Sequence, residues 1–404
     1  MNHYTQLSIA FILIAVTVSF VYYMKQDIEY FSDYKDSAYT KQVALLSKKY
    51  DPYSSKKRPI SELVKNTKIS ESNQCFVNFY SLGCRYPGFL GPANNGYWNP
   101  DIAIQLAVNS GCRTFIFDID YITNCDNLYP RMVVRNSKGI SIIKDDVLCN
   151  DATNSNIKEV CDKINFYAFS SCENKKDPVV IVLYFLQKPP GENNSITVLN
   201  YYSEVAKALS PFKNRLLDSD VNNGVFYRQK QENMLLINNI TDYNGKVLIF
   251  SNANTSGFRE SPIKYSSYED LDFLVNLRLQ YTQTQLGITE KGTGAGILEV
   301  ASNFMNIPSD QLQSTVQHIT KNWTLCLSTE QIDKDTYGKI TNTYGVHCIP
   351  TTIFDDNTFM YSKDLFEIYS FIPKPDKLSY KKPAKVIASE PNPANVKLLP
   401  IGVP

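Results

Sequence analysis

An acid pair at the end of an apolar run is the first candidate for chemistry in this sequence. Asp118 and Asp120 lie at the end of the run Thr114–Tyr121, which is otherwise mostly apolar. Carboxylate oxygens are the ligands that hard divalent cations prefer, so the pair could hold a metal ion. The alternative is that both are polar groups at the rim of a sheet or barrel with no further role.

Histidine, the usual acid–base side chain near neutral pH, is scarce in this chain. Only His3, His318 and His347 occur. His3 precedes an apolar segment, and His318 lies in a helical pattern. His347 begins the last predicted strand, at the end opposite the one where parallel strands carry reactive groups. The histidines are therefore not placed to work with the acid pair.

Short apolar runs separated by helical stretches must position these residues. Continuous apolar runs are typical of buried parallel strands. The predicted strands are Cys75–Leu82, Thr114–Tyr121, Arg131–Val134, Val179–Leu186, Val225–Tyr227, Lys246–Ser251, Thr324–Ser328 and His347–Phe354. The predicted helices are Asp101–Ser110, Asn156–Phe169, Val198–Ala208, Tyr268–Gln280 and Ser309–Lys321. This interleaving predicts an α/β fold, a TIM-type β/α barrel, with a doubly wound sheet as the alternative.

Composition divides the 404 residues into four parts. We expect a membrane anchor over residues 1–25, a charged stalk or linker over 26–72, the barrel over 73–372 and a proline-rich tail over 373–404. Seven prolines fall in that tail, so it should run extended, as a disordered segment, a strap over the barrel or a docking strip for protein partners. The net charge of +1 gives no reason to expect nucleic-acid binding.

The segment Leu7–Met24 predicts a single transmembrane helix. It carries no charged residue, it is long enough to cross a bilayer, and Tyr22 and Tyr23 stand where interfacial aromatics are expected. A cleaved signal peptide is the main alternative, but no basic residue precedes the segment and no small-x-small site follows it. A buried core helix is the other alternative.

The side of the membrane on which the barrel lies stays open at this point. Lysines follow the predicted span and none precedes it, which favours a cytosolic barrel. Nine scattered cysteines and four glycosylation sequons leave a lumenal barrel with disulfides possible. The sequons begin at Asn193, Asn239, Asn254 and Asn322. No cysteine pair has the spacing of a zinc site.

Several stretches, in order along the chain, resemble the X region of phosphatidylinositol-specific phospholipase C. They are Phe79–Arg85, Gly111–Asp120, Pro130–Asn136, Ala168–Phe169 with Asp177–Leu183, and Asn244–Phe250. The sequence looks most similar to the divergent phospholipase-C-like phosphodiesterases that large DNA viruses encode. The resemblance implies a β/α barrel whose site uses two histidines and a calcium ion on a phosphodiester substrate.

This chain departs from that pattern at both histidine positions. The first aligns with Cys84 or its neighbour, and the second with Arg135 or Asn136. A thiol with an unperturbed pKa near 8.5 is a poor proton shuttle at pH 7.

The implied calcium ligands depart as well. Asp118 and Asp120 keep acidic side chains, but Arg85 replaces an asparagine and Tyr184 replaces a glutamate. An arginine among the ligands would repel calcium.

These departures favour a catalytically degenerate, membrane-tethered barrel with a structural or binding role, in a virion or in a viral or host internal membrane. We expect no cofactor, with calcium needed only if the protein is active. Expected partners are the lipid membrane, a lipid headgroup or other anionic ligand at Arg85 and Arg135, and proteins that bind the tail. One alternative is an active phosphodiesterase on phosphoinositide-type lipids. The other is a metal-dependent glycosyltransferase that uses Asp118 and Asp120.

Overall fold

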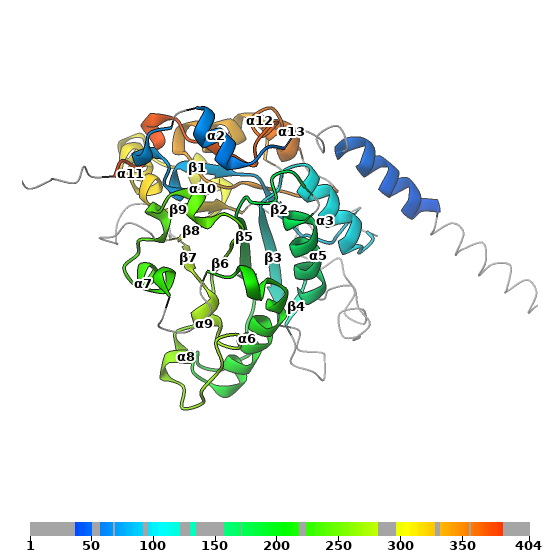
Figure 1. Ribbon diagram of the computed structural model, residues 1–404, viewed down its shortest axis with the longest axis vertical. Helices are drawn as coiled ribbons and strands as arrows, with labels where there is room; N and C mark the ends of the chain where they lie inside the picture. Colours follow the sequence, from blue (N-terminus) through cyan, green and yellow to red (C-terminus); the bar gives the residue numbers. More distant parts are fainter. Residues whose placement is uncertain are drawn as a thin grey trace, which may run out of the picture.

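Eight parallel strands form a nearly closed barrel in the part of the chain that the structure describes (Figure 1). The structure is a computed structural model, and it describes residues 37–50, 57–67, 69–91, 96–121, 130–134, 157–170, 172–217, 224–281, 296–327, 332–354 and 357–382. The barrel strands are β2 (Gly83–Arg85), β3 (Thr114–Asp120), β5 (Val179–Phe185), β6 (Val247–Ser251), β7 (Leu277–Tyr281), β8 (Gly296–Glu299), β9 (Trp323–Cys326) and β10 (Pro350–Thr351). Their order is β10-β2-β3-β5-β6-β7-β8-β9, and a bridge between Leu325 and Cys348 brings the two ends together. The predicted β/α barrel is therefore confirmed over the doubly wound sheet.

Both faces of the barrel strands are buried, which explains their continuous apolar character. Every residue of β3 and of β6 is buried. Ile116 and Phe250 belong to one apolar cluster that includes Trp323 and fills the barrel. Phe117 and Ile249 belong to a second cluster, between the strands and the helices. Each large apolar side chain so buried contributes about 1.5–3 kcal/mol.

Helices connect the strands and cover the outside of the barrel. They are α2 (Ile60–Asn66), α3 (Pro100–Asn109), α5 (Ile157–Phe169), α6 (Ile196–Ala208), α7 (Val225–Gln231), α8 (Gly257–Glu260), α9 (Leu271–Leu274), α10 (Ala301–Met305), α11 (Leu312–Lys321), α12 (Lys334–Lys339) and α13 (Thr358–Ser362). At the start of α3, the Asn99 side chain accepts a hydrogen bond from the Ile102 backbone N–H, and Pro100 stands at the first helical position. The predictions of α3, α5, α6 and α11 are confirmed.

Four predicted elements are wrong or incomplete. Cys75–Leu82 forms a 3-10 turn at Phe76–Asn78 and the short strand β1 (Phe79–Ser81), which lies outside the barrel sheet. Val225–Tyr227 begins helix α7 rather than a strand, because the helix formers that follow outweigh a run of only three residues. Tyr268–Gln280 is not one helix: α9 ends at Leu274, and alternating buried and exposed residues then form β7. Arg131–Met132 forms β4, which pairs antiparallel with the end of β3 outside the barrel order. Strands β2 and β8 were not predicted as elements of their own.

The segment predicted as a stalk contains elements that pack on the barrel. Residues 37–50 form a helix whose Leu46 and Tyr50 are buried, and the Tyr50 hydroxyl donates to the Ile353 carbonyl at 2.9 Å. Ile60, the first residue of α2, donates its N–H to the Asp177 carboxylate at 2.8 Å. No helix among the described residues is long and apolar enough to cross a membrane, and the predicted span Leu7–Met24 lies outside those residues.

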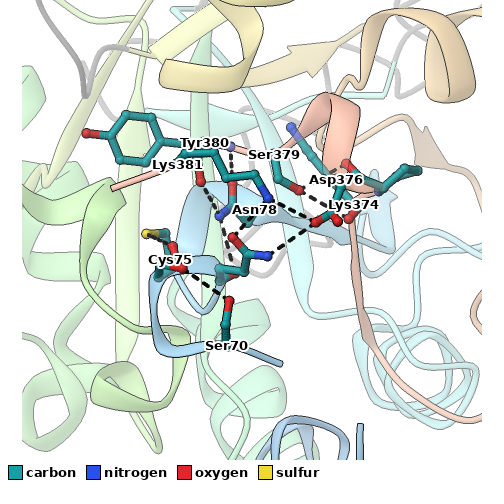
Figure 2. Close-up of polar contacts among 11 residues, drawn as sticks. Ser70, Cys75, Asn78, Lys374, Asp376, Ser379, Tyr380 and Lys381 are labelled. Carbon is teal, nitrogen blue, oxygen red and sulfur yellow. Dashed lines mark hydrogen bonds and ion pairs between the residues drawn. The ribbon is translucent and has the colours of Figure 1, made fainter. Parts of the chain in front are cut away.

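Residues 371–382, which include the first residues of the predicted tail, form a strap across the amino-terminal end of the barrel. Strand β11 (Phe371–Pro373) pairs antiparallel with β1 (Phe79–Ser81). Figure 2 shows Asn78 between Lys374 and Tyr380 of the strap. The Asn78 side chain accepts from the Tyr380 N–H at 2.6 Å and donates to the Tyr380 carbonyl at 2.9 Å. The backbone carbonyl of Asn78 accepts from the Lys374 N–H at 2.8 Å. The rest of the predicted tail lies outside the described residues.

Asn78→Ala is expected to destabilise the fold by about 1–3 kcal/mol, because it removes three hydrogen bonds of a buried side chain, two of them to the strap. Urea unfolding of the full chain measures the change. Asn73→Ala is the matched control, since the Asn73 side chain makes only exposed contacts to the strap, and it should alter stability by less than about 0.5 kcal/mol. Equal losses in the two variants would contradict this role of Asn78.

Candidate functional site

The carboxyl ends of the barrel strands meet at one mouth, where barrels of this class carry their reactive groups. In Figure 1 strand β3 runs down toward β4, so this mouth faces the lower part of the view. Strands β2 and β3 are adjacent and parallel, with Arg85 opposite Ile116. That register brings Arg85 close to Asp118, two residues further along β3.

Arg85 and Asp118 form a buried ion pair inside the mouth. The Arg85 Nε donates to Asp118 Oδ1 at 3.0 Å, and Nη2 donates to Oδ2 at 2.6 Å. The Asp118 side chain is 0% exposed and that of Arg85 is 8% exposed. Burial alone would lower the pKa of Arg85, but the Asp118 carboxylate outweighs it and holds the pKa above its usual value. The pair is therefore a charged bidentate contact within a low-dielectric environment.

Aromatic rings surround the guanidinium of this pair. The Arg85 guanidinium carbon lies 4.9 Å from the centre of the Tyr86 ring and 5.9 Å from that of Tyr184. The Tyr184 hydroxyl forms a hydrogen bond of 2.6 Å with the hydroxyl of Tyr281, the last residue of β7. Burial and the hydrogen bond to the Tyr184 hydroxyl raise the pKa of Tyr281, so the phenol of Tyr281 stays neutral at physiological pH. The mouth beside the ion pair thus offers two phenol hydroxyl groups.

An apolar cap lies beside the ion pair on one side of the mouth. We define it as the buried residues Tyr86, Phe89, Val133 and Val134, against which Trp98, Leu186 and Phe354 pack. Tyr86 follows β2 and Val133 follows β4, so the cap forms where these strands end. Phe354, which follows β10, packs edge-on against Phe89 with ring centres 5.0 Å apart. The cap surrounds this part of the mouth with apolar rather than charged side chains.

The other residues singled out from the sequence lie in different places. Asp120 is 8% exposed, accepts from the Tyr121 N–H at 2.9 Å, and stands opposite Arg131 of β4. Cys84 is fully buried in the layer between barrel and helices, so its side chain faces away from Arg85. Arg135 and Asn136 lie outside the described residues, and their roles stay predictions.

The residues at the mouth do not fit a calcium ion of the kind that the resemblance implies. Both Asp118 oxygens accept from Arg85, and a guanidinium so close to a carboxylate repels a cation. Within the described ranges, no group of three or more His, Cys, Asp and Glu side chains could hold a metal ion. Calcium requires six to eight oxygen ligands. The structure thus pairs Asp118 with Arg85, and the metal-binding role of Asp118 and Asp120 stays a prediction.

His347 lies at the opposite end of the barrel, as predicted, in a contact that the sequence did not indicate. Its Nδ1 accepts from the Thr324 N–H at 2.9 Å, and its Nε2 lies 2.7 Å from the Val77 carbonyl and 2.6 Å from Lys374 Nζ. Because Nδ1 accepts a backbone N–H, the imidazole proton belongs on Nε2, and Lys374 must face it as a neutral amine. Burial lowers the pKa of both side chains far below their ordinary values.

Comparison with known proteins supports the fold. The sequence matches no family model, and no curated protein matches it. Among solved structures, PLC21 of S. officinalis shares 13% identity over 78% of this chain, with a TM-score of 0.50. The chain spans 39% of the length of that protein.

Two bacterial enzymes resemble the chain over most of their own length. A calcium-dependent phosphoinositol-specific phospholipase C from Pseudomonas sp shares 13% identity, with 75% of this chain and 96% of that one covered and a TM-score of 0.44. A calcium-dependent enzyme from Streptomyces antibioticus shares 9% identity, covers 74% and 99%, and has a TM-score of 0.43. The structural neighbours are thus phospholipases C at low sequence identity.

Proposed function

We propose that this chain is a membrane-tethered barrel of the phospholipase C type that does not cleave phosphodiesters and serves a binding or structural role. The Arg85–Asp118 ion pair carries the proposal. It stands at the mouth where the resemblance implies an asparagine and an acidic side chain that share a cation. A guanidinium there satisfies the carboxylate permanently and offers no proton at neutral pH, since arginine stays protonated.

The placement of the described histidines, neither of which lies beside the ion pair, also supports this proposal. General acid–base catalysis needs a group whose pKa lies near the working pH and within reach of the substrate, and each such group contributes about 10² to 10⁴-fold. Of the two histidines in the described residues, His347 is buried at the opposite end of the barrel and His318 is in α11. The described residues at the mouth offer phenols, the ion pair and the carboxylates of Asp120 and Glu299 instead. Without a histidine beside them, these groups suit recognition of a sugar-like group better than proton transfer.

The test is hydrolysis of phosphatidylinositol by the full-length protein reconstituted in vesicles, with calcium or with EDTA. We expect release of inositol phosphate at background in both conditions. Turnover that Asp118→Asn abolishes, while the exposed control Asp376→Asn leaves it intact, would revive the active phosphodiesterase. Turnover of a nucleotide sugar with manganese would favour the glycosyltransferase. Either result would overturn the proposal.

The membrane tether is the second part of the proposal and rests on Leu7–Met24. We propose that the barrel lies on the cytosolic side of a viral or host internal membrane. The burial of a sequon supports this side: Asn322, which begins Asn-Trp-Thr, is 1% exposed and donates from Nδ2 to the His318 carbonyl at 2.9 Å. A glycan attached to that residue before folding could not be accommodated where β9 begins. The seven described cysteines are free thiols, as a reducing compartment favours.

Endoglycosidase treatment of the protein from membranes tests this topology. We expect the gel mobility of the protein to stay unchanged. In sealed vesicles whose cytosolic face is outward, we expect protease added outside to digest the barrel. An added sequon ahead of residue 7 serves as the control for the translocated end. A mobility shift that Asn193→Gln or Asn254→Gln removes would place the barrel in the lumen and contradict the proposal.

A further inference from the structure

Cys172 differs from the other described cysteines in its access to solvent. It lies in the loop between α5 and β5, and its side chain is partly exposed. The remaining described cysteines are buried: Cys75, Cys84, Cys112, Cys161, Cys326 and Cys348. Solvent access is the first requirement for a cysteine that reacts with oxidants. Cys172 is therefore the described thiol that meets it.

A buried arginine is directed at this thiol and has hydrogen-bonding capacity left over. Arg113 is 0% exposed, and its Nη2 lies 3.1 Å from Cys172 Sγ. Nη2 also donates to Oδ1 of Asn174 at 2.6 Å and to its carbonyl at 3.2 Å. The Nε and Nη1 donors find no acceptor among the residues that the structure describes. Buried donors without an acceptor are costly, so a further acceptor beside Cys172 would be favoured.

The position of the guanidinium is fixed by a network of hydrogen bonds. The Asn174 Nδ2 donates to Asp177 Oδ2 at 3.2 Å and to Ser370 Oγ at 2.8 Å. Asp177 also accepts from the Ile60 N–H of α2. Burial raises the pKa of Asp177 to about 6, although Arg113 opposes this, so the carboxylate is charged at pH 7. The network holds Arg113 beside the thiol independently of any ligand.

We propose that Cys172 is a site of reversible oxidation by hydroperoxides, with Arg113 as the group that binds the oxidised sulfur. The sulfur attacks one peroxide oxygen, so a sulfur–oxygen bond forms as the oxygen–oxygen bond breaks. The thiol proton passes to the leaving oxygen, which departs as an alcohol, or as water from hydrogen peroxide. The sulfur loses two electrons and becomes a sulfenic acid. Its new oxygen is a stronger acceptor than the thiol sulfur for the Nη2 donor of Arg113, which lies 3.1 Å from Sγ. The hydroxyl replaces the thiol as donor to the Ala168 carbonyl, 3.2 Å from Sγ.

The experiment treats the full-length protein with hydrogen peroxide and traps sulfenic acid with dimedone. Peptide mapping by mass spectrometry then assigns the label to individual cysteines. A parallel sample without peroxide is alkylated with N-ethylmaleimide to measure thiol access at each residue. We expect dimedone on Cys172 and none on Cys161, which is buried on the neighbouring helix α5. Dimedone on Cys172 no greater than on Cys161 would overturn the proposal.

The ratio of dimedone to maleimide label on Cys172 measures sulfenic acid formation relative to thiol access, and it tests the role of Arg113. Arg113→Lys keeps the charge but removes the planar donors, so the ratio should fall roughly tenfold, the worth of one charge-assisted hydrogen bond. A role limited to packing would change access, and hence both labels together. Should Arg113→Lys not fold, Asn174→Ala tests the same point, because it removes the acceptor that orients the guanidinium. An unchanged ratio in the folded variant would exclude Arg113 as the stabilising group.

Discussion

Asp118→Ala is expected to lower the free energy of unfolding by about 3–5 kcal/mol, because it leaves the buried Arg85 guanidinium without its counter-ion. Guanidinium chloride unfolding of the full chain measures this loss. Arg85→Ala should cost a similar amount for the reciprocal reason. The magnitude follows from burial: taking a charge out of water costs several kcal/mol, and only the partner offsets it.

The double variant Arg85→Met with Asp118→Leu removes both charges and keeps apolar side chains of similar volume in their place. Apolar side chains of similar volume should restore most of the stability that either single truncation removes, because no uncompensated charge remains. Arg58 and Glu62 form a matched exposed pair, with side chains 58% and 37% exposed. Glu62→Ala should change stability by no more than about 0.5 kcal/mol. A double variant as unstable as the single ones would show that the mouth depends on more than the pairing of the two charges.

Lys374→Met is expected to stabilise the protein at pH 7 by about 0.5–2 kcal/mol, the usual gain from a stabilising substitution. Burial lowers the pKa of Lys374 well below 10.5, so folding at neutral pH requires the amine to lose its proton. Methionine fills similar space without that cost, and the His347 Nε2–H retains the Val77 carbonyl as acceptor. Thermal unfolding should show a raised midpoint.

The pH dependence identifies the cause of this gain. Between the depressed pKa in the folded state and 10.5 in the unfolded chain, the unfolded state binds one more proton, so the stability of the natural protein rises with pH. The gain from Lys374→Met should therefore shrink as the pH approaches 10.5. Lys377→Met, at an exposed position of the same strap, should give no gain at any pH. A gain for Lys374→Met that is constant with pH would point to packing rather than to proton release.

The strands were predictable from the sequence where the apolar runs are long. The run of β3 is seven residues and is buried throughout, so composition alone indicates a strand covered on both faces. Strand β7 shows the opposite case: only Leu277 and Leu279 alternate with exposed residues, directly after the apolar turn of α9. A stretch of sequence long enough to reveal a helical pattern includes both α9 and β7, so their different periods together predict one helix.

The site was predictable only in part. Asp118 was recognisable because an acid at the end of a buried strand is unusual, but its partner depends on the register between β2 and β3. Sequence spacing gives no information about register between strands 33 residues apart. The contact of His347 with Lys374 depends likewise on how the strap crosses the barrel. The apolar cap was not predicted, because its residues and those packed against it follow four different strands, β2, β4, β5 and β10, and meet only in the folded barrel.

We propose that Arg85 occupies the Asp118 carboxylate, where the resemblance to phospholipase C implies a cation held by acidic oxygens. The effect of calcium on stability tests this most directly. A ligand present at 100 times its dissociation constant stabilises the folded state by about 2.7 kcal/mol. Thermal unfolding of the full-length protein in millimolar calcium chloride and in EDTA therefore reports whether the mouth binds the ion. We expect the two midpoints to coincide. A midpoint raised by calcium in the natural protein, and no longer raised in Asp118→Asn, would contradict the account.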